Sequence, residues 1–164
     1  MTELIKQLVE DLRTELKEYG EMLALLEEQQ GHLMSRRVDS VLDTVERINA
    51  QTFVLHRTRA VREESQRSLA RAAGDPECAG ILLLVQYLPE EYGPLLQALV
   101  SENNQLLSRV QQRGRQNYLM LSRAVELMQR FISSLTPGHN IIAYGDNGTL
   151  FSNPAPTVLY EALG

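Results

Sequence analysis

Apolar residues recur at alternating steps of three and four along the first part of the chain. They are Ile5, Leu8, Leu12, Leu16, Tyr19, Leu23, Leu26 and Leu33. This spacing keeps one stripe of a helix apolar and is typical of the seam between coiled helices. The stripe weakens at Gly31 and the polar residues after it. We therefore expect a first helix over about 3–35.

A second stripe begins after this interruption. It is formed by Val41, Val45, Ile48, Thr52 and Leu55. Asp39, and Ser40 with Asp43 three positions later, resemble the residues that cap the start of a helix. The pattern predicts a second helix over about 39–72 that folds back on the first. One continuous rod is the alternative, because no proline enforces the break.

The distribution of charge favours the hairpin over the rod. Residues 1–30 hold three basic and eight acidic side chains, whereas residues 56–71 hold five arginines and two glutamates. An antiparallel pair places the basic end of the second helix beside the acidic start of the first, which sets the orientation more than the stability. A phosphate-binding face is the alternative use of these arginines, although no aromatic or Gly-rich element accompanies them.

A linker and a short helix separate the hairpin from a third long helix. Gly74, Pro76 and Gly80 stop the second helix and turn the chain. The segment "ILLLVQYL", residues 81–88, is apolar on all sides, which predicts a short helix covered by the rest of the protein. Pro89 and the two glutamates after it favour a helix start. We expect the third helix over about 90–135.

The seam of the third helix is apolar except at a few positions. It consists of Tyr92, Leu96, Leu99, Asn103, Leu106, Val110, Arg113, Asn117, Met120, Ala124, Met128, Phe131 and Leu135. A polar residue in such a seam fixes the register of the helices at some cost in stability. Asn103 and Asn117 are therefore interpreted as register residues. The alternative is that they receive the backbone of a partner.

The end of the third helix is more apolar than a two-helix seam requires. Apolar residues between 120 and 135 cover about half of the helix circumference, and part of this arc must face the first two helices. The remainder is suited to an amphipathic helix from a partner, for which flexible methionine is well adapted. The alternative cover is the short helix and the tail. The candidate binding residues are Met120, Leu121, Val125, Met128, Phe131, Ile132 and Leu135.

The last part of the chain does not follow a helical pattern. "AYGDNGTLF", residues 143–151, contains Asn147-Gly148, a favoured two-residue hairpin turn, and "SNPAPT" follows it. An isolated hairpin is marginal in water and needs a helix or a partner to hold it. The predicted fold is all-α, an elongated antiparallel three-helix bundle or coiled coil over 1–136, with the short extra helix and a hairpin-like tail over 137–164. Packing of the tail on its own bundle is the alternative to docking on a partner.

Composition limits the classes of partner and compartment. The chain has 16 basic and 21 acidic residues and a net charge of −5, which argues against a general nucleic-acid binder. The opening segment is amphipathic and lacks a signal-peptide pattern, and no apolar run approaches the roughly twenty residues that span a bilayer. Cys78 is the single cysteine. We therefore expect a cytoplasmic protein that neither inserts into membranes nor binds nucleic acid.

No residue pattern indicates catalysis, a metal or a cofactor. His32, His56 and His139 are scattered, without a second ligand at a metal-binding spacing. No paired cysteines and no Gly-rich phosphate loop occur. Adjacent carboxylates such as Glu27 and Glu28 diverge on a helix. The sequence predicts a binding protein that is not an enzyme.

Three features in this order resemble the FlgN family, the flagellar type III export chaperones, over most of the chain. The first is the opening leucine hairpin, with Asp39 and Leu42 in its middle. The second is "NYLMLSRAVELMQRF", which is similar to the family's Asn-x-x-Leu-Leu pattern from Asn117, with methionine at the first leucine position. The third is the segment "YGDNG", which resembles the family's Tyr-Gly-x-x-Gly segment after the third helix.

The resemblance implies a cytoplasmic, all-helical chaperone without nucleotide dependence. Such proteins bind the C-terminal amphipathic helix of hook-associated (hook–filament junction) proteins, prevent premature assembly and deliver them to the export gate. In the family, the C-terminal part of the chain binds this client, and the tyrosine of the Tyr-Gly-x-x-Gly segment docks on the cytoplasmic domain of the gate. That tyrosine maps onto Tyr144, and the two glycines of the segment map onto Gly145 and Gly148. The apolar end of this tail departs from the family's often polar one. A structural coiled-coil adaptor is the alternative function, and the oligomeric state is left open.

Overall fold

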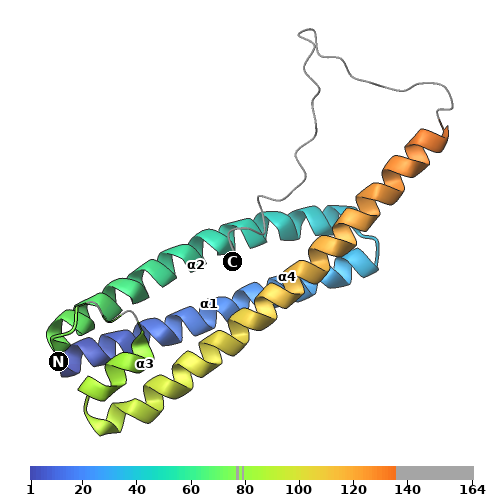
Figure 1. The fold of residues 1–164 in the computed structure, drawn as a ribbon. Helices are drawn as coiled ribbons and strands as arrows, with labels where there is room; N and C mark the ends of the chain where they lie inside the picture. The colour runs from blue at the N-terminus through green and yellow to red at the C-terminus, as the bar shows by residue number, and fades with distance from the viewer. Residues whose placement is uncertain (77, 79, 136–164) are drawn as a thin grey trace, which may run out of the picture.

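Three long helices and a short helical connection make up the described part of the chain. A computed structural model describes residues 1–76, 78 and 80–135. The elements are α1 (Thr2–Met34), α2 (Val38–Ala73), α3 (Ile81–Leu84), two 3₁₀ turns, η1 (Val85–Tyr87) and η2 (Glu90–Tyr92), and α4 (Gly93–Leu135). The predicted all-α class and elongated helical packing are confirmed (Figure 1). The predicted hairpin-like tail lies outside the described residues.

The turn between α1 and α2 is closed by its own backbone. Arg36 has a φ of +55°, a left-handed conformation that often ends a helix. The N–H groups of Arg36 and Arg37 donate to the carbonyls of Leu33 (3.2 Å) and His32 (3.0 Å). The expectation that Asp39 or Ser40 caps α2 was wrong: the helix begins at Val38, without a side-chain capping bond. These backbone bonds turn the chain early and leave Asp39 within the first turn.

α1 is the central helix and packs along both α2 and α4. Most of its predicted stripe is buried, and Leu16 and Leu33 are half-buried. One core cluster joins the start of α1 to the end of α2, to α3 and to the start of α4. Its buried members are Ile5, Leu8, Val9, Leu12, Leu69, Ala70, Leu84, Leu88, Leu96 and Leu99. The short apolar helix is covered on one side only, because Leu82 and Leu83 are exposed.

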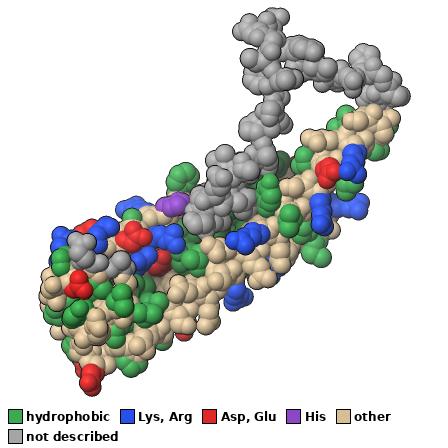
Figure 2. Space-filling view, in the orientation of Figure 1, with side chains coloured by type: hydrophobic (Ala, Val, Ile, Leu, Met, Phe, Trp, Pro, Cys, Tyr) green, Lys and Arg blue, Asp and Glu red, His purple; other side chains and the backbone are tan. Residues whose placement is uncertain are grey.

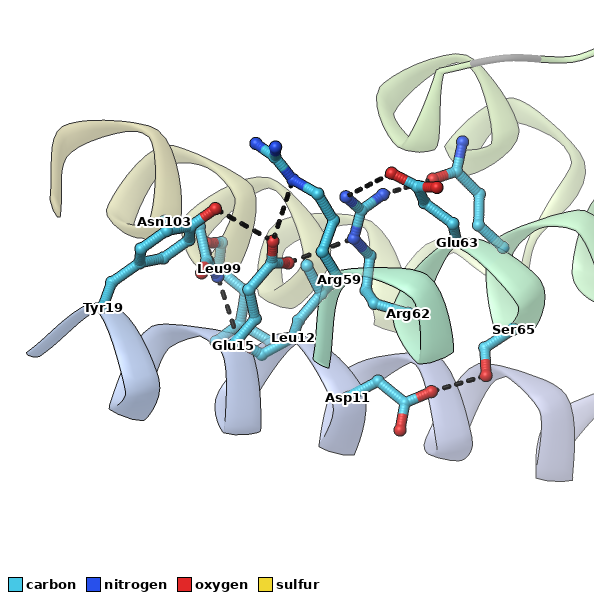
Figure 3. A network of polar contacts seen from close by, with 11 residues as sticks. Asp11, Leu12, Glu15, Tyr19, Arg59, Arg62, Glu63, Ser65, Leu99 and Asn103 are labelled. Carbon is cyan, nitrogen blue, oxygen red and sulfur yellow. Dashed lines mark hydrogen bonds and ion pairs between the residues drawn. The ribbon is translucent and has the colours of Figure 1, made fainter. Parts of the chain in front are cut away.

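A second core cluster lies toward the hairpin turn. Its buried members are Tyr19, Met22, Leu23, Leu26, Ile48, Leu55 and Val110. Polar contacts connect the hairpin between the two clusters, as Figure 3 shows. The Arg62 Nε donates to a Glu15 carboxylate oxygen at 3.0 Å, and the Ser65 hydroxyl donates to Asp11 at 2.5 Å. The basic end of α2 therefore lies beside the acidic start of α1, as the charge pattern predicts.

Asn103 and Asn117 set α4 parallel to α1 in one register. The Asn103 Nδ2 donates to the Leu12 carbonyl at 3.1 Å, and the Asn117 Nδ2 donates to the Leu26 carbonyl at 2.7 Å. Both bonds join residues that are 91 positions apart. These contacts within the chain support the register interpretation. Both amides keep a buried Oδ1 without a hydrogen-bond partner among the described residues.

Candidate binding surface at the end of the last helix

α4 continues past the helix that covers it. The offset of 91 residues places Met34, the last residue of α1, level with Val125. Residues 126–135, which we call the overhang, therefore lie beyond the end of α1. At 1.5 Å per residue the overhang is about 15 Å long. Figure 1 shows the orange end of α4 projecting past the α1–α2 turn.

The apolar stripe of α4 continues unchanged past the level at which α1 ends. Leu96, Leu99 and Val110 of this stripe are buried. Residues at steps of three and four share one face of a helix, so Met128 and Phe131 continue the same stripe. They are 62% and 63% exposed. The overhang thus presents, uncovered by any described helix, the kind of face that α1 buries earlier along α4.

The seven predicted binding residues fall into two groups on this side of α4. Met120 and Leu121 are half-buried, near the level at which the hairpin ends. Five are exposed: Val125, Met128, Phe131, Ile132 and Leu135. The structure thus places four of the exposed residues on the overhang, Val125 level with the end of α1, and the half-buried pair just before it.

Two exposed apolar residues at the hairpin turn were missed by sequence reasoning. Met34 is 74% exposed and Val38 is 63% exposed. Both flank the turn, and the helix register places Met34 level with Val125. The signal that could have found them is the pair of apolar residues on either side of the polar segment 35–37. The candidate surface is therefore the overhang together with the end of the hairpin.

The comparison with family models decides the identity of the chain. The model described as FlgN protein matches residues 1–151, which include α1, α2, α3, α4 and the start of the tail. The chain belongs to the FlgN family. This is the family of flagellar export chaperones, which confirms the resemblance and supports a role in flagellar export in general. Searches among curated proteins and among solved structures give no significant match.

Asn117 has a structural explanation within this FlgN-family chain. It is the last buried residue of α4, and besides the Leu26 carbonyl its amide reaches the Gln29 side chain at 3.0 Å. These bonds hold α4 on α1 two to three turns before the overhang begins. Met120 and Leu121 follow directly and are half-buried. The Asn-x-x-Met-Leu segment therefore marks the border at which α4 leaves the hairpin.

The other predicted site of this FlgN-family chain is not described. Tyr144, Gly145 and Gly148 lie outside the described residues, so their role stays a prediction. In the described ranges no helix is both long and apolar enough to cross a bilayer. Within these ranges, no group of three or more His, Cys, Asp and Glu side chains forms a candidate metal site.

A cavity in the middle of the bundle is less suited to a protein partner. It measures about 120 Å³ and lies between α1, α2 and α4, beside Glu15, Tyr19, Arg62 and Asn103. Glu15 is buried and paired with Arg62, while the Tyr19 hydroxyl donates to Glu15 at 3.2 Å. Burial, together with the nearby Glu15 carboxylate, raises the pKa of the Tyr19 hydroxyl above its usual value. These polar groups bind one another rather than a ligand, and the cavity is too small for a helix.

Proposed function

We propose that this flagellar export chaperone holds the C-terminal amphipathic helix of a hook-associated protein on the overhang. The observation that carries the proposal is the continuation of one apolar stripe from the covered half of α4 to the exposed half. Membership of the FlgN family supports a client from the flagellar hook-associated proteins. The face that binds α1 in the first half of α4 is suited to bind a second helix in the other half.

The chemistry of the surface fits a helix as the client. Methionine adapts to irregular apolar surfaces, and a phenylalanine such as Phe131 offers a large contact area. Fully burying one such side chain contributes about 1.5–3 kcal/mol, from which the cost of association is subtracted. A client helix held in this way has its own apolar face covered. Covering that face prevents premature assembly of the client.

Delivery to the export gate is assigned to the tail in this proposal. A tyrosine combines a large apolar face with a hydroxyl and often anchors interfaces. Tyr144, with Gly145 and Gly148, follows the overhang in sequence and lies outside the seven client residues. We expect Tyr144→Ala to abolish binding to the cytoplasmic domain of the gate while client affinity stays within about twofold. Calorimetry with each partner checks both halves of this statement.

The client site is tested by titration calorimetry with a C-terminal segment of a hook-associated protein. We expect Phe131→Asp to weaken binding at least tenfold, because an unpaired charge in an apolar contact costs several kcal/mol. Leu119→Asp is the matched control. Leu119 is 54% exposed on the same helix, and nine residues before Met128 place it on the opposite side. If Leu119→Asp weakens binding as much as Phe131→Asp, the stripe is not the client site.

A further inference from the structure

Arginines without acidic partners collect near the candidate surface. Arg36 and Arg37 form the hairpin turn and are exposed. Neither they nor Arg115 and Arg123 of α4 form an ion pair within the described part of the chain. Figure 2 shows Lys and Arg side chains, in blue, along the projecting end of α4. This end of the molecule therefore carries positive charge that no described acidic side chain pairs with.

Most arginines of α1 and α2, in contrast, form ion pairs with acidic side chains. Arg47 pairs with Glu28 at 2.7 Å, and Arg71 pairs with Glu64 at 2.8 Å. The whole chain has a net charge of −5. Between residues 104 and 135, however, the charged residues are Arg109, Arg113, Arg115, Arg123, Glu126 and Arg130. Glu126 and Arg130 of the overhang pair with each other, so the excess positive charge at the binding end comes from Arg36 and Arg37 of the turn and from Arg123 just before the overhang. This local charge is opposite to the overall acidic charge of the protein.

The register places this charge at one end of the bound helix. α1 buries the α4 stripe as far as Asn117 and half-buries it at Met120 and Leu121. A helix that covers the rest of the stripe therefore takes the next place in line, with one end against the turn. The last carbonyls of α1 already accept bonds from the turn, such as the Ser35 N–H to Gly31 at 3.0 Å. The turn carries the two positive charges of Arg36 and Arg37, and the acid nearest to them in sequence, Asp39, supplies one negative charge. The turn therefore favours a negative group at the adjoining end of the occupant.

We propose that the client segment is an acidic amphipathic helix that runs antiparallel to α4, with its C-terminal end against Arg36 and Arg37. The C-terminal end of a helix carries partial negative charge, and a chain-terminal carboxylate adds a full charge. The opposite direction would bring the positive end of the helix to the two arginines. Arg115 and Arg123 lie off the stripe and accelerate encounter through their field. This inference rests on the proposed function.

Charge preference is tested with two synthetic amphipathic peptides that share one leucine stripe. One has glutamate and the other has lysine at every polar position. With the full chain, fluorescence anisotropy at 50 mM salt should give at least tenfold tighter binding of the glutamate peptide, and the gap should narrow at 300 mM salt. The variant carrying Arg36→Glu and Arg37→Glu should lose or reverse this preference. Arg57→Glu is the control and should preserve it, because Arg57 is exposed, lies further along α2 and forms no ion pair with the residues that the structure describes.

Orientation is tested by disulfide trapping. Met34→Cys introduces a thiol at the exposed end of α1, in a background where Cys78→Ser removes the native one. The glutamate peptide is made with a single cysteine at either its C-terminal or its N-terminal end. We expect the C-terminal cysteine to be trapped at least fivefold faster. Equal or faster trapping of the N-terminal cysteine overturns the orientation.

The outcomes separate this inference from the proposed function. If both peptides bind equally and Phe131→Asp weakens both, the acidic-helix inference is wrong and the client site stands. If the hook-associated segment itself does not bind the wild-type chain, the proposed function fails. If the chain forms a dimer that Phe131→Asp abolishes and binds neither peptide, a second copy is the occupant. That result also overturns the inference.

Discussion

The two halves of α4 share one pattern of apolar residues but have opposite surroundings. From Leu96 to Asn117 the stripe is buried against α1, whereas from Val125 to Leu135 it is exposed. The difference arises from the position at which α1 ends and from the register that Asn103 and Asn117 fix between the two helices. Periodicity identifies the face of a helix that needs a cover. The register then identifies the part of that face that remains for a partner.

Truncating one apolar side chain in each half of α4 should change the free energy of unfolding by very different amounts. Leu96→Ala should lower the free energy of unfolding by about 2–5 kcal/mol, because it leaves a cavity in the core. Phe131→Ala should change it by less than about 0.5 kcal/mol, because the ring is exposed. Urea unfolding followed by circular dichroism measures both. Equal losses would show that the overhang is covered within the free protein.

A second prediction loosens the hairpin that covers the first half. Glu15→Gln should lower the free energy of unfolding by about 2–4 kcal/mol, because the largely buried Arg62 loses its shorter carboxylate contact and keeps only the half-exposed Glu63 at 3.6 Å. Glu64→Gln is the control, since Glu64 pairs with Arg67 and Arg71 on the exposed surface. Its effect should stay below about 1 kcal/mol. Similar values for the two variants would mean that the Glu15 contact contributes no more than a surface pair.

The register is tested by replacing both asparagines with leucine. The double variant should change the unfolding free energy by less than about 2 kcal/mol, because two buried amides with unsatisfied oxygens become apolar while the buried Gln29 side chain loses its bond from Asn117. It should also lose its single register. Spin labels at the exposed positions Glu21 and Gln112, which are level in this register, should give one narrow distance in the parent and a broader distribution in the variant. An unchanged narrow distance would mean that apolar packing alone sets the register.

A weaker effect on stability is expected at alkaline pH. The folded state raises the pKa of Tyr19, so it holds this proton more tightly than the unfolded chain does. The contribution is present below the ordinary pKa of 10.0 and is lost as the pH rises above it. Between pH 10 and 11.5 the parent should therefore lose more stability than Tyr19→Phe. Parallel losses in urea unfolding would mean that burial of Tyr19 does not affect its ionisation.

The long helices were predictable because their stripes follow the geometry of packed helices. The stripe through Ile5 and Leu26, for example, is buried as its spacing indicates. The cap of α2 was not predictable, because backbone bonds of Arg36 and Arg37 close the turn where a side chain such as Asp39 was expected. No periodicity indicates which carbonyl an asparagine will bind.

The binding face was predictable only as an excess of apolar residues. Sequence reasoning did not separate half-buried Leu121 from exposed Met128, because that distinction depends on the level at which α1 ends. It also missed Met34, which belongs to another helix and joins the surface only through the register. Contacts between distant segments therefore define the part of the site that local patterns cannot show.

Hydrogen–deuterium exchange of the full chain, alone and with the hook-associated segment, locates the bound helix on α4. We expect the bound segment to slow amide exchange most strongly over residues 121–135, because a helix covers the stripe there. Exchange over residues 96–110, where α1 already covers the same stripe, should change little. Protection confined to the first half of α4 or to the outer face of α2, with none in the overhang, would show that the client helix does not bind the exposed stripe.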